Sequence, residues 1–151
     1  NETNNHIHTD VDCYISTLIP QDYVEDIFLR LEIYNDISNA KNDYDIDHIV
    51  SKLEDVYGPI PDYLKNLFSL TRVKIEGNRI KADKIKINKE NTVITLNPRS
   101  LIDNDKLINH FVLKNKIKLT DQFNLKYQNI SKDNFCELCE EVISMMKDIS
   151  D

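Results

Sequence analysis

Glycine, cysteine and tryptophan are scarce in this sequence, and each scarcity excludes a class of protein. The 151 residues include two Gly, three Cys and no Trp. Gly58 and Gly77 lie 19 positions apart, which excludes a glycine-rich phosphate loop. Three cysteines without a signal peptide favour a reducing cytoplasm over a disulfide framework. The apolar runs are too short for a transmembrane span or a secretory signal.

Charge is distributed unevenly along the chain. The formal net charge is −7; residues 1–62 carry 14 acidic and 3 basic side chains, and residues 63–151 carry 12 and 16. The length suits one domain. We expect residues 1–151 to form a single domain taken from a longer protein, with residues 1–9 as a flexible linker. The acidic first segment disfavours a DNA-binding face there and favours a basic protein partner, with a simple solvated surface as the alternative.

The spacing of apolar residues predicts an α+β fold. A strand is expected over residues 11–18, followed by three helices and then by small antiparallel strands mixed with two further helices. This order of elements favours α+β over a doubly wound α/β sheet. The expected helices cover residues 27–39, 45–57, 61 to just past 77, 100 or 103 to 113, and 131–149. The expected later strands cover residues 84–87, 92–96, 116–119 and 123–127.

The predicted helices have polar caps and apolar stripes. Asp26 and Asp45 are the expected N-caps of the first two helices. The apolar stripe of the first helix is expected to contain Ile27, Phe28, Leu31, Tyr34 and Ile37. That of the second is expected to contain Ile46, Ile49, Val50, Leu53, Val56 and Tyr57. The C-terminal helix is expected to bury Phe135, Leu138, Val142, Met146 and Ile149.

The stretch Tyr57-Gly58-Pro59-Ile60-Pro61 predicts a tight corner between two helices. Gly58 suits the end of the helix that precedes it, and Pro59 cannot continue that helix. Pro61 suits the first turn of the next helix, where a missing N–H has no consequence. The acidic pair Glu54-Asp55 comes just before this corner.

One group of residues near the start could be imagined as a metal site. His6, His8, Asp10 and Cys13 lie close in sequence. Structural zinc sites need four well-spaced ligands, usually in paired motifs, and this group does not supply them. Solvated histidines on a terminal strand are therefore the favoured interpretation.

Cys136 and Cys139 form a C-x-x-C motif. Redox versions of this motif lie where a strand enters a helix N-terminus, but here the motif lies inside an amphipathic helix, so buried thiols are the favoured interpretation. No histidine lies beside a nucleophile in sequence. We predict no catalytic residue, no metal and no bound cofactor.

Residues 72–90 are the main basic segment, with seven basic and three acidic side chains. A nucleic-acid-contacting module that uses this segment is the alternative function. No aromatic residue interrupts the segment, so base stacking is unavailable. A solvated face is the favoured interpretation.

Two linked motifs resemble a known family. Residues 19–34 resemble I-P-x-D-Y-I-x-D-x-x-x-R-L-x-x-Y, and residues 55–61 resemble D-R-F-G-P-L-P. At this separation both motifs are typical of the C-terminal domain of the bacterial transcription-repair coupling factor family (Mfd), and the resemblance covers about residues 10–97. The signature positions are Pro20, Tyr23, Asp26, Arg30, Leu31, Tyr34, Gly58, Pro59 and Pro61.

The resemblance implies a regulatory domain without enzymatic activity of its own. In the family, the full protein is an ATP-dependent DNA translocase that removes stalled RNA polymerase and recruits the excision-repair protein UvrA. Its motor lies upstream, so ATP, Mg²⁺ and DNA are expected there and not in this domain. The C-terminal domain packs on an N-terminal module similar to UvrB and masks the surface that UvrA binds. A cytoplasmic protein with no membrane partner is implied.

The resemblance also implies a docking site just before the corner. Asp55 matches the family's acidic surface, whereas Lys52 stands where the family often has Glu. Glu54 is a candidate to compensate, although it lies about 100° from Asp55 around a helix. Arg30 is expected in an internal salt bridge and Tyr34 in the core. Two departures from the family pattern are Gly77, where a helix former is usual, and Lys81, where Gly is usual.

Overall fold

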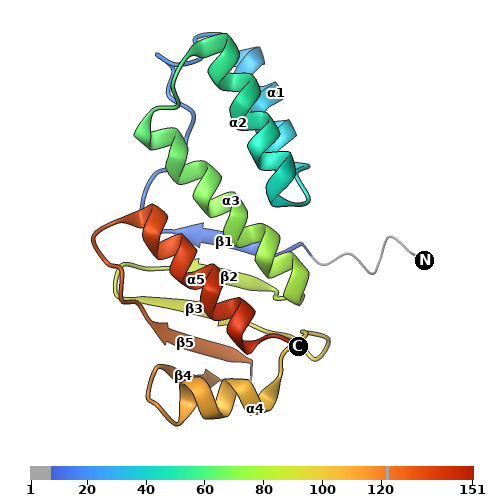
Figure 1. Cartoon of the computed structure of the whole chain (residues 1–151), viewed down its shortest axis with the longest axis vertical. Coiled ribbons are helices and arrows are strands. Elements are labelled where there is room, and N and C mark those ends of the chain that lie inside the picture. Colours follow the sequence, from blue (N-terminus) through green and yellow to red (C-terminus); the bar gives the residue numbers. More distant parts are fainter. Residues whose placement is uncertain (1–7, 122) are drawn as a thin grey trace, which may run out of the picture.

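The chain folds into two lobes that share one long helix (Figure 1). The computed structural model describes residues 8–121 and 123–151. Its elements are β1 (Asp10–Cys13), α1 (Ile27–Ser38), α2 (Asp43–Tyr57), α3 (Asp62–Ile80), β2 (Lys84–Ile87), β3 (Asn91–Thr95), α4 (Asn104–Leu107), the π-helical turn η2 (Ile108–Val112), β4 (Ile117–Asp121), β5 (Asn124–Gln128) and α5 (Phe135–Ile149). The predicted order, one strand, three helices and then short strands mixed with two helices, is confirmed.

A five-stranded sheet forms the base of the larger lobe. Its strand order is β1-β2-β3-β5-β4. The predicted antiparallel pairing holds for β2–β3, β3–β5 and β4–β5, but β1 pairs in parallel with β2. The strand predicted over residues 11–18 ends at Cys13. Three helices separate β1 from β2, which is the crossover that a parallel pair requires.

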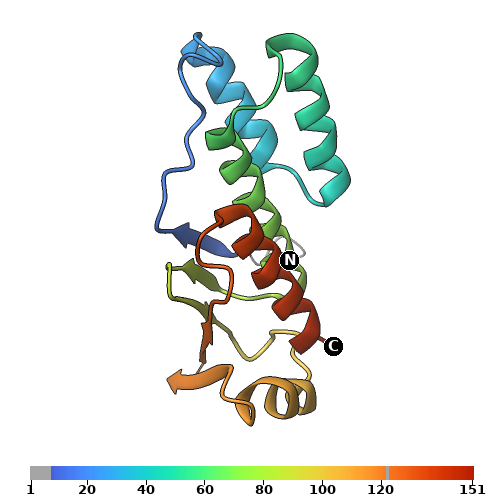
Figure 2. The same cartoon turned by 60° about the vertical axis from the view of Figure 1, so that its left-hand side comes forward.

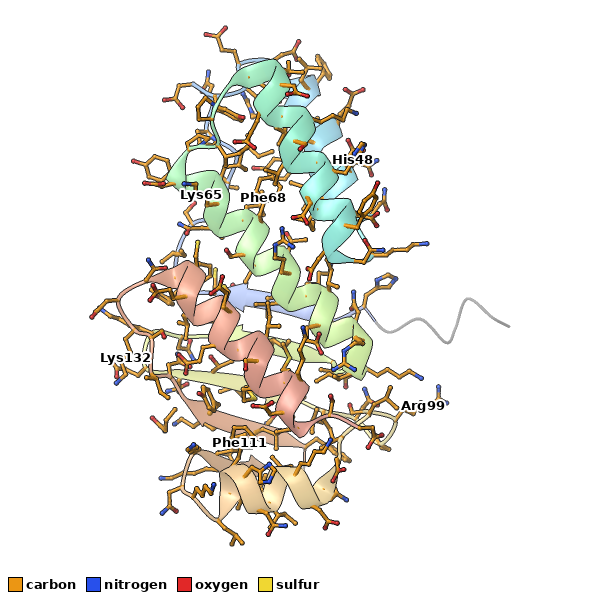
Figure 3. All side chains as sticks on the ribbon, in the orientation of Figure 1. His48, Lys65, Phe68, Arg99, Phe111 and Lys132 are labelled. Atoms are coloured by element: carbon orange, nitrogen blue, oxygen red, sulfur yellow. The ribbon has the colours of Figure 1, made fainter. Side chains whose placement is uncertain are left out.

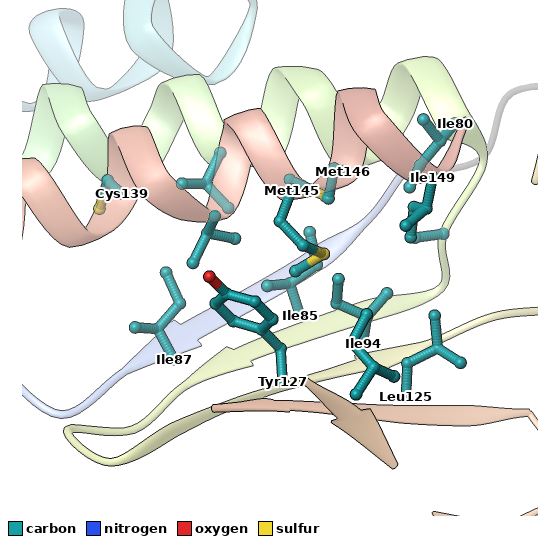
Figure 4. Packing of buried hydrophobic residues seen from close by; sticks show 14 of the residues in the cluster. Ile80, Ile85, Ile87, Ile94, Leu125, Tyr127, Cys139, Met145, Met146 and Ile149 are labelled. Atoms are coloured by element: carbon teal, nitrogen blue, oxygen red, sulfur yellow. The ribbon is translucent and has the colours of Figure 1, made fainter. Parts of the chain in front are cut away.

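The sheet lobe consists of the sheet, the C-terminal half of α3 from Val73, α4, η2 and α5. Helices α3 and α5 lie side by side over one face of the sheet (Figures 1 and 2). As predicted, the apolar stripe of α5 is buried, and it packs on Ile85, Ile94 and Tyr127 of the sheet (Figure 4). Alternation along the strands explains this packing, because every second side chain points to the helix-covered face.

The helical lobe consists of residues 19–24, α1, α2 and the N-terminal half of α3 up to Phe68. Its core contains Ile33, Ile37, Ile46 and Leu53. Phe68 lies on the side of α3 that faces α2 (Figure 3). None of the described helices is long and apolar enough to cross a membrane.

The predicted apolar stripe of α1 is only partly correct. Ile37 is buried as expected, but Ile27, Phe28 and Leu31 are exposed by 56%, 74% and 55%, and Ile33 is buried in their place. The helix is apolar on nearly every side, so the sequence pattern does not single out one face. In α2, Val56 was also assigned to the buried stripe, and it is 70% exposed.

Two predicted helix starts are corrected by the capping geometry. The N-cap of α2 is Asn42, whose side chain accepts a hydrogen bond from the amide of Asp45 at 2.8 Å. The Asp45 carboxylate accepts in turn from the amide of Lys41 at 2.9 Å, which makes a reciprocal capping pair. The C-terminal helix begins at Phe135 after the cap Asn134, later than the predicted residue 131.

Gly77 is required by the close approach of α3 to the sheet. A Cβ atom at this position would lie 2.8 Å from Cδ1 of Ile85 and 2.8 Å from Cγ2 of Thr9. Thr9 itself is buried, and its hydroxyl donates to the carbonyl of Ala82 at 2.8 Å. The expected linker over residues 1–9 therefore does not include Thr9, and residues 1–7 lie outside the described residues.

Lys81 occupies a position that favours glycine. It is the C-cap of α3 and has φ of 60°, in the left-handed region. Its carbonyl accepts hydrogen bonds from the side chains of Asn97 and Ser100, both at 2.8 Å. These two bonds hold a lysine in a backbone conformation that glycine adopts without strain.

Candidate functional site

A rigid corner joins α2 to α3, as the sequence predicts. Gly58 has φ of +87°, which favours glycine, and its N–H donates to the carbonyl of Glu54 at 3.0 Å. The hydroxyl of Tyr23 lies 2.8 Å from the carbonyl of Gly58 and 3.3 Å from that of Leu53. The last turn of α2 is therefore tied to the segment that precedes α1, and the directions of its side chains are fixed.

Pro59 and Pro61 complete this corner in slightly different roles. Pro59 is exposed and directly follows the end of α2. Pro61 is the N-cap of α3, one residue before the first turn that was predicted for it. Its carbonyl accepts from the amides of Leu64 and Lys65. The corner residue Pro61 therefore also begins the hydrogen bonding of α3.

Two further signature residues organise the start of α1. The carbonyl of Pro20 accepts from the amide of Tyr23 at 3.1 Å, which closes a turn. Asp26 caps α1 as predicted, and its carboxylate accepts from the amide of Phe28 at 2.8 Å. The Asp26 contact satisfies an amide that would otherwise lack a partner at the helix start, and the Pro20 contact shapes the segment that leads to the helix.

Arg30 and Tyr34 hold the same segment from within α1. Arg30 was predicted to form an internal salt bridge; in the described part of the chain it instead donates to the carbonyls of Val24 at 2.6 Å and Glu25 at 2.8 Å. Tyr34 is half-buried against the core, and its hydroxyl accepts from the amide of Ile19 at 2.7 Å. The hydrogen bonds of Arg30 and Tyr34 therefore stabilise the helical lobe from within.

Lys52 and Asp55 share one outward face of α2. Both are exposed, they lie three positions apart on the helix, and neither forms an ion pair with another described residue. Glu54 lies about 100° from Asp55 and about 200° from Lys52 around the helix, so it does not replace a carboxylate at position 52. Burial and then the charge of Glu54 raise the pKa of Tyr23.

A groove of about 440 Å³ runs between α1 and α2. It combines an apolar floor with a mostly acidic rim. Lys52 lines it, and so do residues at both ends of the helix pair: Leu29, Glu32, Asp36, Asp45, Ile49 and Val56. His48 lies on the same outer side of α2 (Figure 3). An apolar floor with charged edges is typical of a protein-docking surface.

Part of the acidic charge of α2 is already neutralised within the domain. Arg72 of α3 forms ion pairs with Asp43 at 3.0 Å and Asp47 at 2.6 Å. These contacts join the start of α2 to the middle of α3. The acidic charge that remains unpaired on α2 is therefore concentrated toward its C-terminal end, near Asp55.

The basic segment 72–90 does not form one surface. Arg72 is engaged as above, and Arg79 pairs with Glu76 and donates to the hydroxyl of Ser150 at 2.9 Å. Lys84 and Lys86 are exposed on β2, on the sheet face that α3 and α5 leave uncovered. The segment is split between the helix-covered side and the opposite side of the sheet.

The three cysteines are placed as small apolar residues. Cys139 is buried in the core of the sheet lobe, and burial raises the pKa of its thiol. Burial also raises the pKa of Cys13. The described residues contain no group of three or more His, Cys, Asp or Glu side chains that could hold a metal; His6 lies outside them. The thiols of Cys13 and Cys139 therefore lack the lowered pKa of redox cysteines.

Exposed apolar side chains beside the acidic surface were missed from the sequence. The apolar spacing predicts that Ile27, Phe28 and Val56 are buried, yet all three are exposed. The sequence does contain one indication of this exposure, because α1 has more apolar residues than one buried face can hold. Such an excess can indicate a contact surface as well as a core.

The family model for the TRCF domain matches residues 13–107 of this chain. The chain is also similar to transcription-repair-coupling factors from several bacteria. It is 27% identical over 141 residues to that of Buchnera aphidicola, which covers 93% of this chain and 17% of the relative. It is 32% identical over 101 residues to that of Myxococcus xanthus, covering 67% of this chain and 8% of the relative.

A solved structure shows the same fold. The crystal structure of a C-terminal domain of transcription-repair coupling factor superposes with a TM-score of 0.76 and 17% sequence identity, covering 94% of this chain and 95% of the other. The chain spans less than a fifth of the curated relatives described above. The matched part of this chain includes the α2–α3 corner and both outward residues of α2.

Proposed function

Because this chain belongs to the TRCF domain family, whose matched relatives are transcription-repair coupling factors, we propose that it is the regulatory domain of such a factor. It docks on a UvrB-like module of the same protein and covers the surface that UvrA binds. The domain itself performs no catalysis and holds no cofactor. Other parts of the parent protein bind ATP, Mg²⁺, DNA and RNA polymerase.

The observation that carries this proposal is the exposed, unpaired Asp55 on a helix end that a rigid corner holds in place. A carboxylate in a fixed direction can select a basic partner surface and set the register of docking. The groove beside it supplies apolar contact area through Leu29 and Val56. Lys52, which lines the same groove, opposes the acidic charge and weakens the match to a basic partner.

The expected contact is weak but sufficient for a domain within the same chain. An exposed ion pair contributes about 0.2–1 kcal/mol. Tethering raises the effective concentration of the partner to the millimolar range for short flexible linkers, so a weak interface stays closed. The same weakness lets a competing interaction open it, because a two-state equilibrium of a few kcal/mol is readily shifted.

The test is UvrA binding by the full-length factor. Asp55→Arg should weaken docking and raise the affinity for UvrA by about 3- to 10-fold, which corresponds to about 0.7–1.4 kcal/mol. Asp148→Arg, at an exposed position in the last turn of α5, is the matched control and should leave the affinity unchanged. An unchanged UvrA affinity in the Asp55→Arg protein would exclude the role given to Asp55.

A further inference from the structure

The uncovered face of the sheet has its own charge pattern. Helices α3 and α5 cover one face, and within the described residues no helix covers the other (Figure 2). On β2 the side chains of Lys84 and Lys86 are exposed while Ile85 and Ile87 are buried. The same alternation along β3 and β5 directs one set of side chains away from the helices.

Three lysines lie in one row across this face. The strand registers place Lys86 opposite Val93, Val93 opposite Lys126, and Lys126 opposite Lys118. Lys84 lies two residues from Lys86 on the same face. None of these four lysines forms an ion pair with another described residue. Asp10 and Asp12 lie on the neighbouring edge strand β1, and the backbone of Asp121 on β4 pairs with Asn124.

The pair formed by Lys118 and Lys126 is unfavourable in the free domain. Like charges directly opposite each other on adjacent strands destabilise a sheet. Asp10 and Asp12 lie opposite Lys84 and Lys86 on β1 and do not face this pair. An anion bound between the two lysines would remove the repulsion, so the face is arranged to gain from an anionic partner.

The chemistry of the face favours a nucleic-acid backbone over a protein. Lysine is depleted in protein–protein interfaces, whose centres are apolar and aromatic, whereas here Val93 is the one large apolar side chain in the lysine row. The outward strand positions of the described sheet contain no aromatic residue, so bases of a single strand would find no stacking platform. Exposed lysines over a polar surface can instead neutralise the phosphates of a duplex.

The dimensions also fit a duplex. Neighbouring strands lie about 4.8 Å apart, so Lys86 and Lys118 are separated by about 14 Å across three strand intervals. The major groove of B-DNA is about 12 Å wide. Lysines at the two ends of the row can therefore contact phosphates on both sides of one groove, with the uncharged outward residues of β3 between them.

We infer that the uncovered sheet face, through Lys84, Lys86, Lys118 and Lys126, binds the sugar–phosphate backbone of duplex nucleic acid without sequence preference. The acidic helical lobe lies at the far end of the molecule from α4 and β4 (Figure 1), so it does not cover this face. This inference does not depend on the proposed docking of Asp55, which uses the other lobe. It gives the domain a DNA contact separate from any motor.

Fluorescence anisotropy of a labelled 20-base-pair DNA duplex of mixed sequence tests this inference directly. With four phosphates neutralised, the plot of log K against log salt concentration should have a slope of about −3.6, since each phosphate contributes about −0.9. Replacing all four lysines with glutamine should reduce the affinity at least tenfold at 20 mM salt. Replacing only Lys118 and Lys126 should roughly halve the slope.

A matched control removes the same charge from other surfaces. Lys41→Gln, Lys65→Gln, Lys74→Gln and Lys147→Gln, combined in one variant, should change the affinity less than twofold. Thermal unfolding of both variants checks that they fold, because exposed substitutions change stability by about 0.5 kcal/mol or less. Absence of binding by the wild type at 20 mM salt would overturn the inference, as would an equal loss in the control variant.

A DNA single strand and poly-glutamate distinguish duplex binding from binding of a single strand or of an acidic protein. A single strand of equal length should bind more weakly than the duplex, and tighter binding of the single strand would contradict the duplex geometry. Poly-glutamate should displace the duplex poorly at equal charge concentration. Efficient displacement by poly-glutamate would instead assign the face to an acidic protein and overturn the nucleic-acid assignment.

Discussion

The sheet lobe and the helical lobe share α3 but use their apolar residues differently. The core of the sheet lobe contains about twice as many buried residues as that of the helical lobe. In the helical lobe, large apolar side chains such as Phe28, Leu31 and Val56 remain exposed. The sheet lobe thus provides most of the burial that stabilises the domain, and the smaller core of the helical lobe leaves much of its apolar surface exposed.

The lobes also differ in charge. Acidic side chains outnumber basic ones on α1 and α2, whereas the uncovered sheet face has four lysines that form no ion pair with another described residue. The net charge of −7 conceals two surfaces of opposite sign on one small domain. Partners of opposite charge can therefore bind the two lobes independently.

The largest expected effects come from matched cavity variants in the two cores. Leu138 in α5 and Leu64 in α3 are both fully buried. Replacing either with alanine should cost about 2–5 kcal/mol. We expect Leu138→Ala to lower the unfolding free energy of the whole domain, and Leu64→Ala to open the helical lobe first. Hydrogen exchange resolved by residue measures this difference; equal loss of protection in both lobes for both variants would contradict the division.

Gly77→Ala tests the contact between α3 and the sheet. Helix propensity alone would make this substitution stabilising by about 1 kcal/mol. The added Cβ would lie 2.8 Å from atoms of Ile85 and Thr9, and such overpacking costs about 1–3 kcal/mol. We therefore expect a lower unfolding midpoint in urea. A raised midpoint would mean that Thr9 moves away freely.

Glu141 should make the sheet lobe sensitive to acid. Burial raises the pKa of this carboxyl, but hydrogen bonds from the hydroxyl of Tyr127 at 2.6 Å and from the amides of Ser131 and Ile130 outweigh burial, and the net pKa is lowered from its usual value of about 4.5. The ionised carboxylate of Glu141 therefore adds to the free energy of unfolding above about pH 4.5. This contribution is lost as the pH falls through the folded-state pKa.

The variant Glu141→Gln should lose about 1–2 kcal/mol at pH 7 and should show a weaker dependence of stability on pH below 4.5. Urea unfolding at pH 7 and at pH 3.5 measures both effects. The difference in unfolding free energy between the wild type and the variant should be smaller at pH 3.5 than at pH 7. A constant difference would show that the carboxylate charge does not stabilise the lobe.

Tyr23→Phe tests the rigid corner of the helical lobe and has the smallest expected effect. Losing the hydroxyl contact to Gly58 should cost about 0.5–1.5 kcal/mol. Hydrogen exchange at the amide of Gly58, which bonds to Glu54, should speed up more than exchange in the sheet. Uniform acceleration in both lobes would contradict a local role for Tyr23.

Local signals in the sequence predicted much of the fold. Asp26, Gly58 and the alternating residues of β2 and β3 act through neighbouring residues, so their patterns identify a cap, a helix end and a hairpin. The C-terminal stripe was predicted because α5 has one clear apolar face. These features depend on interactions between residues that are close together in the sequence, so the pattern of one sequence predicts them.

The parts that could not be predicted depend on contacts between distant residues. The parallel pairing of β1 with β2 joins positions separated by three helices. Gly77 looks unfavourable in a helix until Thr9 and Ile85 are placed against it. The lysine row on the sheet face likewise depends on the pairing of β2, β3, β5 and β4, which the sequence alone does not give.

The docking proposal is tested most directly by calorimetric titration of this domain with the UvrB-like module of the same protein. Asp55→Arg should weaken binding about tenfold, and Lys52→Glu, on the same face of α2, should strengthen it about threefold. Opposite changes from two residues three positions apart would identify this face as the contact. Changes in the same direction, or affinities within twofold of the wild type for both variants, would contradict the proposal.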